Sequence, residues 1–233
     1  MMTGRLVFGY GALYHNGMST FKAEHAGDLR RDLAYRNLYT PRPAHIVASD
    51  HHRLYHQAAA VMGSDEPVTY LEFGVASGNS MRRMVAEFTH PDSVFVGFDS
   101  FVGLPEDWLM HKTGAFSNHG VPPDIGDSRV RFVTGWFQNT LHENLAWIDP
   151  FLKRKVLIHY DADLYTSTSF LLSSMWPRCN EYYFIMDDFM VEDIVALHDF
   201  SLAYPVNIAF LARLEGGVPH AVFGHMKRTA LVI

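Results

Sequence analysis

The sequence has a single cysteine, no long hydrophobic segment and no excess of positive charge. Because one cysteine, Cys179, cannot form an internal disulfide, a reducing cytoplasm is the expected compartment. No stretch is long and apolar enough to span a bilayer, and the first residues contain no signal-peptide core, so no membrane association is expected. The net charge of −6, with histidine neutral, argues against a nucleic-acid partner.

The chain also lacks internal repeats, low-complexity segments and the usual hydrolase and thiol motifs. It contains no G-x-S-x-G elbow, and Cys179 lies beside a proline-terminated helix without an activating neighbour. The 233 residues, 48% hydrophobic and 19% charged, are enough for one α/β domain with a sizeable core.

Seven apolar segments are predicted to form strands, at 68–73, 94–98, 130–134, 156–160, 182–186, 207–214 and 220–233. Helical patterns follow the first, fourth and fifth of them, near 79–88, 166–175 and 191–203. Strands that alternate with helices predict an α/β fold with a mostly parallel, doubly wound sheet. The last two strands, joined by residues 215–219, predict an antiparallel hairpin at the end of that seven-stranded sheet.

The first 65 residues differ from the rest, because they are rich in arginine, histidine and tyrosine. A helix is predicted at 28–39, and the two prolines at 41 and 43 end it. Ser49 and Asp50 then form a predicted N-cap for a second helix to about Met62. We expect residues 1–65 to form a helical arm that acts as a lid or as a contact in a homodimer, and residues 66–233 to form the main domain.

Residues 71–80, Leu-Glu-Phe-Gly-Val-Ala-Ser-Gly-Asn-Ser, join the first main strand to its helix. They form either an ordinary connection or a ligand site built from backbone N–H groups and a helix N-terminus. Three residues separate Gly74 from Gly78, which is not the dinucleotide spacing, so a nicotinamide oxidoreductase is a remote alternative. The acid Glu72 at the strand end suits an amine-bearing ligand such as S-adenosylmethionine.

Acidic residues gather where the strands end, which in an open α/β sheet is the ligand-binding edge. Asp99, at the end of the second strand, is suited to both hydroxyls of a ribose, or it caps a turn. Asp161 and Asp163 follow the fourth strand, and Asp187 and Asp188 follow the fifth.

Asp161, Asp187 and Asp188 are the candidate metal ligands. Two adjacent strand ends bring their carboxylates close together, and such like charges raise one another's pKa unless a cation neutralises them. Oxygen ligands favour Mg²⁺ or Mn²⁺ over zinc. The alternative is a set of solvated or backbone-capping acids.

Histidines and aromatic residues supply further candidates. The long loop at 105–129 carries His111 and His119, either of which is a candidate general base or a solvent-exposed residue. His159, inside a strand, is interpreted as a core histidine. Trp136 and Phe137, just past the third strand, either flank an adenine or belong to the core.

Five motifs in sequence resemble one family, the metal-dependent macrolide-sugar O-methyltransferases of the macrocin and mycinamicin type. This family belongs to the class I S-adenosylmethionine-dependent methyltransferases, with a Rossmann-like sheet. The motifs are Leu-Glu-Phe-Gly-Val at 71–75 with Gly78 and Ser80, Asp-Ser-Phe-Val-Gly-Leu-Pro at 99–105, 130–141 with Gly-Trp-Phe-Gln-Asn, Asp-Ala-Asp-Leu-Tyr at 161–165, and Asp-Asp-Phe at 187–189. The resemblance covers about residues 68–190.

The resemblance implies methyl transfer from S-adenosylmethionine to a hydroxyl of a sugar or glycoside, with a small-molecule or glycan acceptor. It implies Mg²⁺ on Asp161, Asp187 and Asp188, and a histidine base, with His111 the first choice and His119 the second; Asp161 also belongs to the catalytic set. The expected cofactor residues are Glu72, Gly74, Ser80, Asp99, Ser100, Trp136 and Asp161.

Two alternatives of function stay open at this point. Vicinal hydroxyls on a metal suit a catechol-type or phenolic acceptor as well as a sugar. A binding protein that kept the fold and lost catalysis is the third interpretation, against which the clustered acids argue. The N-terminal region and the C-terminal hairpin match the family poorly, so the acceptor is not identified.

Overall fold

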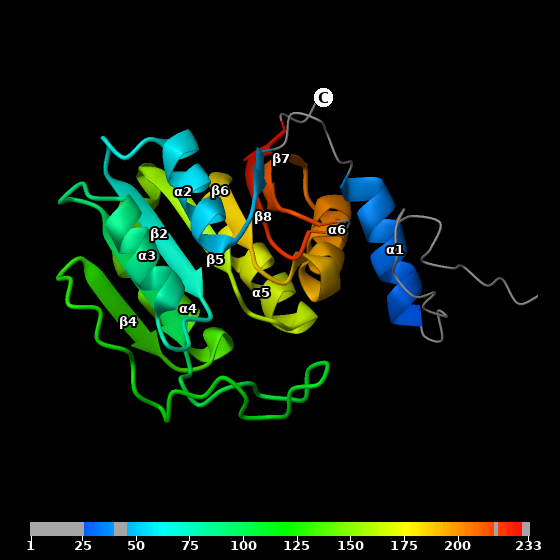
Figure 1. Ribbon diagram of the computed structural model, residues 1–233, viewed down its shortest axis with the longest axis horizontal. Helices are drawn as coiled ribbons and strands as arrows, with labels where there is room; N and C mark the ends of the chain where they lie inside the picture. Colours follow the sequence, from blue (N-terminus) through cyan, green and yellow to red (C-terminus); the bar gives the residue numbers. More distant parts are fainter. Residues whose placement is uncertain (1–25, 40–45, 217–218, 230–233) are drawn as a thin grey trace, which may run out of the picture.

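The computed structural model describes residues 26–39, 46–216 and 219–229, and in them a central sheet lies between two layers of helices (Figure 1). The sheet has eight strands. They are β1 (Ile46–Ala48), β2 (Val68–Phe73), β3 (Val94–Asp99), β4 (Val130–Thr134), β5 (Lys155–Tyr160), β6 (Glu181–Met186), β7 (Val206–Leu214) and β8 (Val222–Arg228).

The helices and helical turns alternate with these strands along the chain. They are α1 (Ala26–Leu38), α2 (His51–Met62), α3 (Asn79–Glu87), α4 (Phe137–Ile148), the 3-10 turn η2 (Asp149–Lys153), α5 (Tyr165–Met175), the π-helical turn η3 (Phe189–Asp193) and α6 (Ile194–Ala203).

The strand order is β1-β7-β8-β6-β5-β2-β3-β4. All neighbouring strands are parallel except β8, which is antiparallel to both β6 and β7. The doubly wound sheet and its antiparallel hairpin are therefore confirmed. The predicted number of seven strands was wrong by one, because the three-residue β1 is too short to show an alternating pattern.

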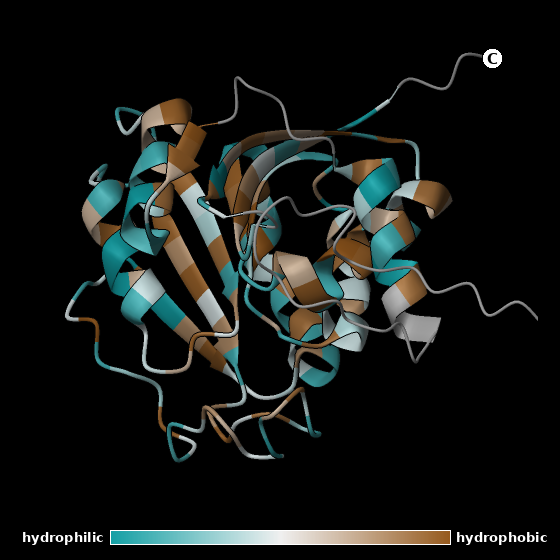
Figure 2. Cartoon of the chain, turned by 45° about the vertical axis from the view of Figure 1, so that its right-hand side comes forward, coloured by the Kyte–Doolittle hydropathy of each residue, from teal (hydrophilic) through white to brown (hydrophobic). Residues whose placement is uncertain are grey.

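Two apolar cores lie on the two faces of the sheet. Helices α2 and α3 cover one core, and α4, α5 and α6 cover the other, with α1 packed on α6 at the edge of the molecule. Every residue of β2 is buried, as expected for a parallel strand that is covered on both faces. Figure 2 shows the same distribution, with hydrophobic residues concentrated along the central strands.

Two helical segments differ from the predicted pattern. Helix α4, which buries Leu141, Leu145 and Ile148, follows the third main strand, where no helix was predicted. The predicted helix at 191–203 begins two residues earlier, as the π-helical turn η3, and becomes α-helical at Ile194. This turn brings Asp193 into the interior, where it is fully buried.

The N-terminal region contributes to the sheet as well as to the helix layers. Strand β1 pairs with β7, and α2 begins at the predicted N-cap, where the Asp50 carboxylate accepts a hydrogen bond from the backbone N–H of Arg53. Residues 1–25 lie outside the described part, and the division at residue 65 and the lid or dimer role stay predictions. In the described residues, no helix is long and apolar enough to cross a membrane.

The carboxyl ends of β2, β3, β5 and β6 are aligned at one edge of the sheet. Phe73 is level with Phe98, Tyr160 is level with both Phe73 and Met186, and backbone hydrogen bonds extend the ladder past the strands. The N–H of Gly74 donates to Phe98, that of Asp161 to Phe73, and that of Asp187 to Tyr160. The first residues of three connecting segments are thus fixed in register.

Two glycines in the β2–α3 connection have backbone conformations that a side chain disfavours. Gly74 has φ +94°, and a Cβ there would lie 1.7 Å from the carbonyl oxygen of Asp161. Gly78 caps α3 in the left-handed conformation, with φ +78°. The backbones of this connection and of the segment after β5 can approach so closely because residue 74 is glycine.

We predict that Gly74→Ala destabilises the protein far more than Gly126→Ala. Both positions have positive φ, which costs an alanine about 1–2 kcal/mol. A Cβ at Gly126 meets nothing within 4 Å, whereas at Gly74 it overlaps a backbone oxygen. Urea unfolding of both variants should give an additional loss of more than about 3 kcal/mol for Gly74→Ala; equal losses would contradict the steric account.

Candidate active site

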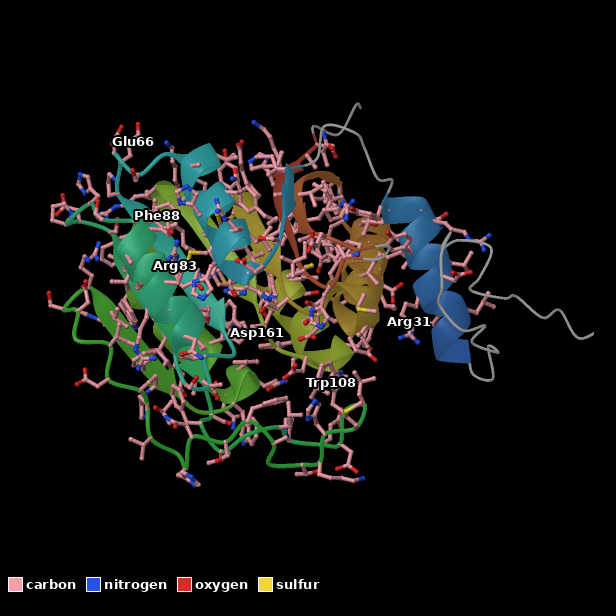
Figure 3. The ribbon with its side chains drawn as sticks, viewed as in Figure 1. Arg31, Glu66, Arg83, Phe88, Trp108 and Asp161 are labelled. Carbon is pink, nitrogen blue, oxygen red and sulfur yellow. The ribbon has the colours of Figure 1, made fainter. Side chains whose placement is uncertain are left out.

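A cavity of about 310 Å³ opens at the carboxyl edge of the sheet. Its walls come from four strand ends and from the long loop between β3 and β4 that runs beneath the sheet in Figure 1. Figure 3 shows Asp161 at the strand ends, above the loop that carries Trp108. The side chains that line it include Asp99, Phe116, Trp136, Asp161 and Asp163.

Five of the seven predicted cofactor-binding residues line the cavity. These five are Gly74, Asp99, Ser100, Trp136 and Asp161. Trp136 lies in the segment before α4 with 38% of its surface exposed, so it is a wall of the cavity rather than a core residue. Phe137 lines the cavity as well, and its ring also packs against Phe73 in the core.

Asp99 already accepts three backbone hydrogen bonds. Its Oδ2 accepts from the N–H groups of Val75 and Ala76, at 2.7 and 2.8 Å, and its Oδ1 accepts from Phe101 at 2.6 Å. A carboxylate has about four lone-pair positions. Asp99 therefore caps the glycine connection and keeps capacity for about one further donor, fewer than the two ribose hydroxyls expected from the sequence.

Glu72 and Ser80 lie behind the cavity wall and do not line it. The Glu72 side chain is fully buried, and the hydroxyl of Ser80 donates to its Oε1. Its Oε2 has no hydrogen-bond partner among the described residues. Burial raises the pKa of Glu72 to about 7, against the opposing effect of His159.

The acidic residues form two groups that share Asp161. One group consists of His159, Asp161 and Asp187, and the other of Asp161, Asp163 and Asp188, with one ligand atom from each residue within 4.8 Å of the others. The predicted set of Asp161, Asp187 and Asp188 is thus divided, with Asp187 turned toward His159. Asp163, which has φ +60°, joins Asp188 as an additional acid.

The four aspartates of these groups are crowded together in a partly buried place. Burial, together with the neighbouring carboxylates, raises the pKa of Asp161 well above its usual range and that of Asp163 to about 8. In the described ranges, no lysine or arginine forms an ion pair with these four aspartates. The carboxylates of Asp161, Asp163 and Asp188 fit a hard divalent cation, and the nearby Asp187 Oδ1 has no hydrogen-bond partner among the described residues.

Three histidines lie near Asp187 and Asp188. His159 Nε2 is 3.4 Å from Asp187 Oδ1, His51 Nε2 is 3.7 Å from the same oxygen, and His220 Nε2 is 3.8 Å from Asp188 Oδ1. Burial alone would raise the pKa of Asp187, but the imidazole of His159 holds it below its usual value. His220 is exposed and His51 is partly exposed, whereas His159 is buried, as predicted.

The structure does not bring the two predicted bases to the acids. The ring of His111 stacks on Trp108 at 5.7 Å and lies 4.7 Å from Phe116, and His119 is exposed. Neither residue lines the cavity, so their catalytic role stays a prediction.

Sequence reasoning missed several residues at the site. Asp163 was noted as an acid at a strand end but not as a metal ligand. Its position beside Asp188 depends on its left-handed backbone conformation, which the sequence pattern did not predict. His51 and His220 come from segments outside the recognised motifs. Asp193, hydrogen-bonded by Thr168 at 2.7 Å, is turned inward by η3.

We predict that stability decreases with pH in the metal-free protein, partly through Asp193. Burial raises the pKa of this carboxyl to about 8, against about 3.9 in an unfolded chain. The folded state therefore holds the proton between about pH 4 and 8 while the unfolded state has lost it, and the contribution disappears as pH rises to 8. Each such group adds a slope of up to about 1.4 kcal/mol per pH unit.

Urea unfolding between pH 5 and 8 in EDTA measures this slope. In Asp193→Asn the free energy of unfolding should decrease less steeply with pH. The slope that is left comes from Glu72 and Asp163, whose pKa values are also raised. A slope identical to that of the unchanged protein would show that Asp193 is ionised in the folded state.

Comparison with known proteins gives one family match and two curated relatives. Residues 113–208 match the macrocin O-methyltransferase family, TylF. The demethyldecarbamoylnovobiocin O-methyltransferase of Streptomyces niveus is 28% identical, over 56% of each chain. The 8-demethyl-8-(2,3-dimethoxy-alpha-L-rhamnosyl)-tetracenomycin-C 4'-O-methyltransferase of Streptomyces olivaceus is 29% identical, over 63% of each. The chain thus spans less than two thirds of the length of these relatives.

Among solved structures, the O-methyltransferase NovP is similar to this chain with a TM-score of 0.50. It shares 22% sequence identity, and the similarity covers 87% of this chain and 98% of that one. The strand order, the hairpin and this similarity agree on the fold. The family match includes three of the five motifs that carry the resemblance, those at 130–141, 161–165 and 187–189. The chain has a Rossmann-like fold similar to that of NovP.

Proposed function

We propose that this protein is an S-adenosylmethionine-dependent O-methyltransferase that uses Mg²⁺ or Mn²⁺ and methylates a hydroxyl of a sugar or glycoside. One observation carries the proposal: Asp161 is a wall of the cavity and also a member of both acidic groups. A cofactor in the cavity and an acceptor oxygen at the carboxylates would therefore meet at one residue.

The cavity suits the cofactor in three ways. The absence of a side chain at Gly74 keeps the wall next to Asp161 open. The free position on Asp99 Oδ1 can accept a ribose hydroxyl, and the exposed face of Trp136 can stack on adenine. Glu72, enclosed behind the wall, acts through Ser80 and the start of α3 rather than by touching the methionine amine.

The acids suit the metal. Asp161, Asp187 and Asp188, with Asp163 beside them, would hold the ion, which when bound lowers the pKa of a coordinated hydroxyl and orients it toward the methyl group. The sulfonium already makes the methyl electrophilic, so the residues of the chain need only to align the donor and the acceptor and to receive one proton. Such alignment contributes on the order of 7–11 kcal/mol.

The acceptor class rests on the relatives and on the rim of the cavity. One relative is named for the 4'-O-methylation of a rhamnosyl group and the other for a novobiocin derivative. The loop next to the cavity exposes Leu109, Met110, Phe116 and Val121, of which Phe116 lines the cavity itself. These side chains support an acceptor in which the sugar is attached to a larger apolar body.

We predict that Trp136→Ala weakens S-adenosylhomocysteine binding about tenfold or more, while Trp136→Phe retains most of the affinity. Stacking of a base on an aromatic ring contributes about 1–3 kcal/mol, and 1.4 kcal/mol corresponds to a factor of ten. Calorimetric titration of the three proteins with S-adenosylhomocysteine measures the difference. Equal affinity for all three would mean that adenine does not lie against Trp136.

We predict that Asp188→Ala abolishes metal-dependent methyl transfer and changes S-adenosylhomocysteine affinity by less than about threefold. The reason is that Asp188 belongs to an acidic group and does not line the cavity. Turnover is measured on a panel of glycosides and catechols, with Mg²⁺ or with EDTA.

The matched control is Asp92→Ala, because Asp92 is an exposed acid just before β3, at the opposite edge of the sheet. It should behave as the unchanged protein. Full turnover in EDTA would rule out a metal requirement. Methyl transfer to catechols and to none of the glycosides would show that the acceptor is phenolic. Cofactor binding without turnover on any acceptor would favour the binding-protein alternative.

A further inference from the structure

A buried polar layer lies directly behind the acidic groups. Its centre is His159 on β5, whose side chain has no exposed surface. Residues two apart on a strand point to the same face, so His159 lies on the same face as Asp161, one step deeper in the sheet. The ring of Tyr55, from α2, covers His159 at 5.5 Å.

Both nitrogens of His159 face polar groups. Nδ1 lies 2.8 Å from the hydroxyl of Tyr70 and 3.8 Å from Oε1 of Glu72. Nε2 faces Oδ1 of Asp187 at 3.4 Å without a well-aligned hydrogen bond, and neither atom has a hydrogen-bond partner among the described residues. The imidazole thus connects β2, which leads into the glycine connection, with the first acid after β6.

The hydrogen-bonding capacity of these groups determines which nitrogen carries the proton. Within the described residues, His159 Nδ1 is the hydrogen-bond partner of the buried Tyr70 hydroxyl, and a buried hydroxyl without an acceptor for its proton is costly. When Tyr70 donates to Nδ1, a neutral imidazole carries its own proton on Nε2, facing Asp187. Nε2 then has no lone pair to offer a metal.

We propose that His159 is a positioning residue for the metal site. Tyr70 fixes its tautomer, and its Nε2–H, which faces Asp187, donates to that carboxylate and orients it when the metal is bound. The proposal rests on the proposed function, because Asp187 matters as a ligand only if a metal binds. In this proposal His159 orients a metal ligand and does not bind the metal itself, although one of its nitrogens lies close enough to Asp161 and Asp187 for direct ligation.

A histidine or another donor behind a ligating carboxylate orients that carboxylate, and its removal typically reduces metal affinity 10- to 100-fold. The loss in this protein should be specific to the metal, because His159 does not line the cofactor cavity. A merely structural histidine would affect both ligands equally, through the stability of the fold.

The test is calorimetric titration with Mn²⁺ alone and, separately, with S-adenosylhomocysteine, in the full chain. The variants are His159→Leu, His159→Gln and Tyr70→Phe. Glutamine places an N–H group near the position of Nε2, so it should restore most of the affinity that leucine removes. The matched control is His225→Leu, a partly buried histidine on β8 whose Nε2 faces Glu181 instead.

The expected result is a loss of Mn²⁺ affinity of about tenfold or more in His159→Leu, a smaller loss in Tyr70→Phe, and near-normal binding in His159→Gln and His225→Leu. S-adenosylhomocysteine affinity should stay within about threefold in all of them, which also shows that each variant is folded.

Electron spin echo spectroscopy of bound Mn²⁺ separates support from direct ligation. Absence of directly coordinated imidazole nitrogen supports the proposal, and a nitrogen signal that disappears in His159→Gln overturns it. Unchanged Mn²⁺ affinity in His159→Leu overturns this proposal alone. Absence of Mn²⁺ binding in the unchanged protein overturns both this proposal and the metal requirement of the proposed function. The titration with S-adenosylhomocysteine then tests the cofactor site independently.

Discussion

The parallel pairing of β5 with β2 on one side and β6 on the other is the constraint on which the rest of the site depends. Together with the pairing of β2 and β3, it brings Gly74, Asp161 and Asp187 to one edge, each tied by its backbone N–H to a carbonyl group at the end of a neighbouring strand. The close approach of Gly74 to the Asp161 carbonyl is possible only without a side chain. The fold thereby fixes where the cofactor cavity and the acidic groups meet before any ligand is present.

The same constraint concentrates negative charge in a partly buried place. The acids that follow parallel strands lie at the same edge of the sheet, and the helices on both faces limit the access of water to these acids. Two effects limit this charge: burial raises the pKa of Asp163 and of Asp193 to about 8, and the imidazole of His159 holds the pKa of Asp187 below its usual value. A divalent cation would replace the protons, which gives the proposed metal a thermodynamic as well as a catalytic role.

The sequence was sufficient for the strands, because their apolar runs are bounded by glycine, proline and acids, and for the edge at which the acids gather. It could not reveal β1, three residues whose partner β7 lies over 150 residues away, since such pairing leaves no local pattern. The division of the acids into two groups was equally hidden, because it depends on the side-chain direction of Asp187 and on the left-handed backbone of Asp163. Histidines in a long loop are prominent in a sequence, yet His111 packs on Trp108 instead of reaching the acids.

The most direct measurement of the central claim is calorimetric titration of the protein with Mg²⁺ in two buffers of different ionisation enthalpy near pH 7. If the acids share protons that a metal displaces, Mg²⁺ binds one site and releases protons, so the apparent enthalpy differs between the buffers. Absence of Mg²⁺ binding at millimolar concentration, or binding with no proton release, would contradict the account.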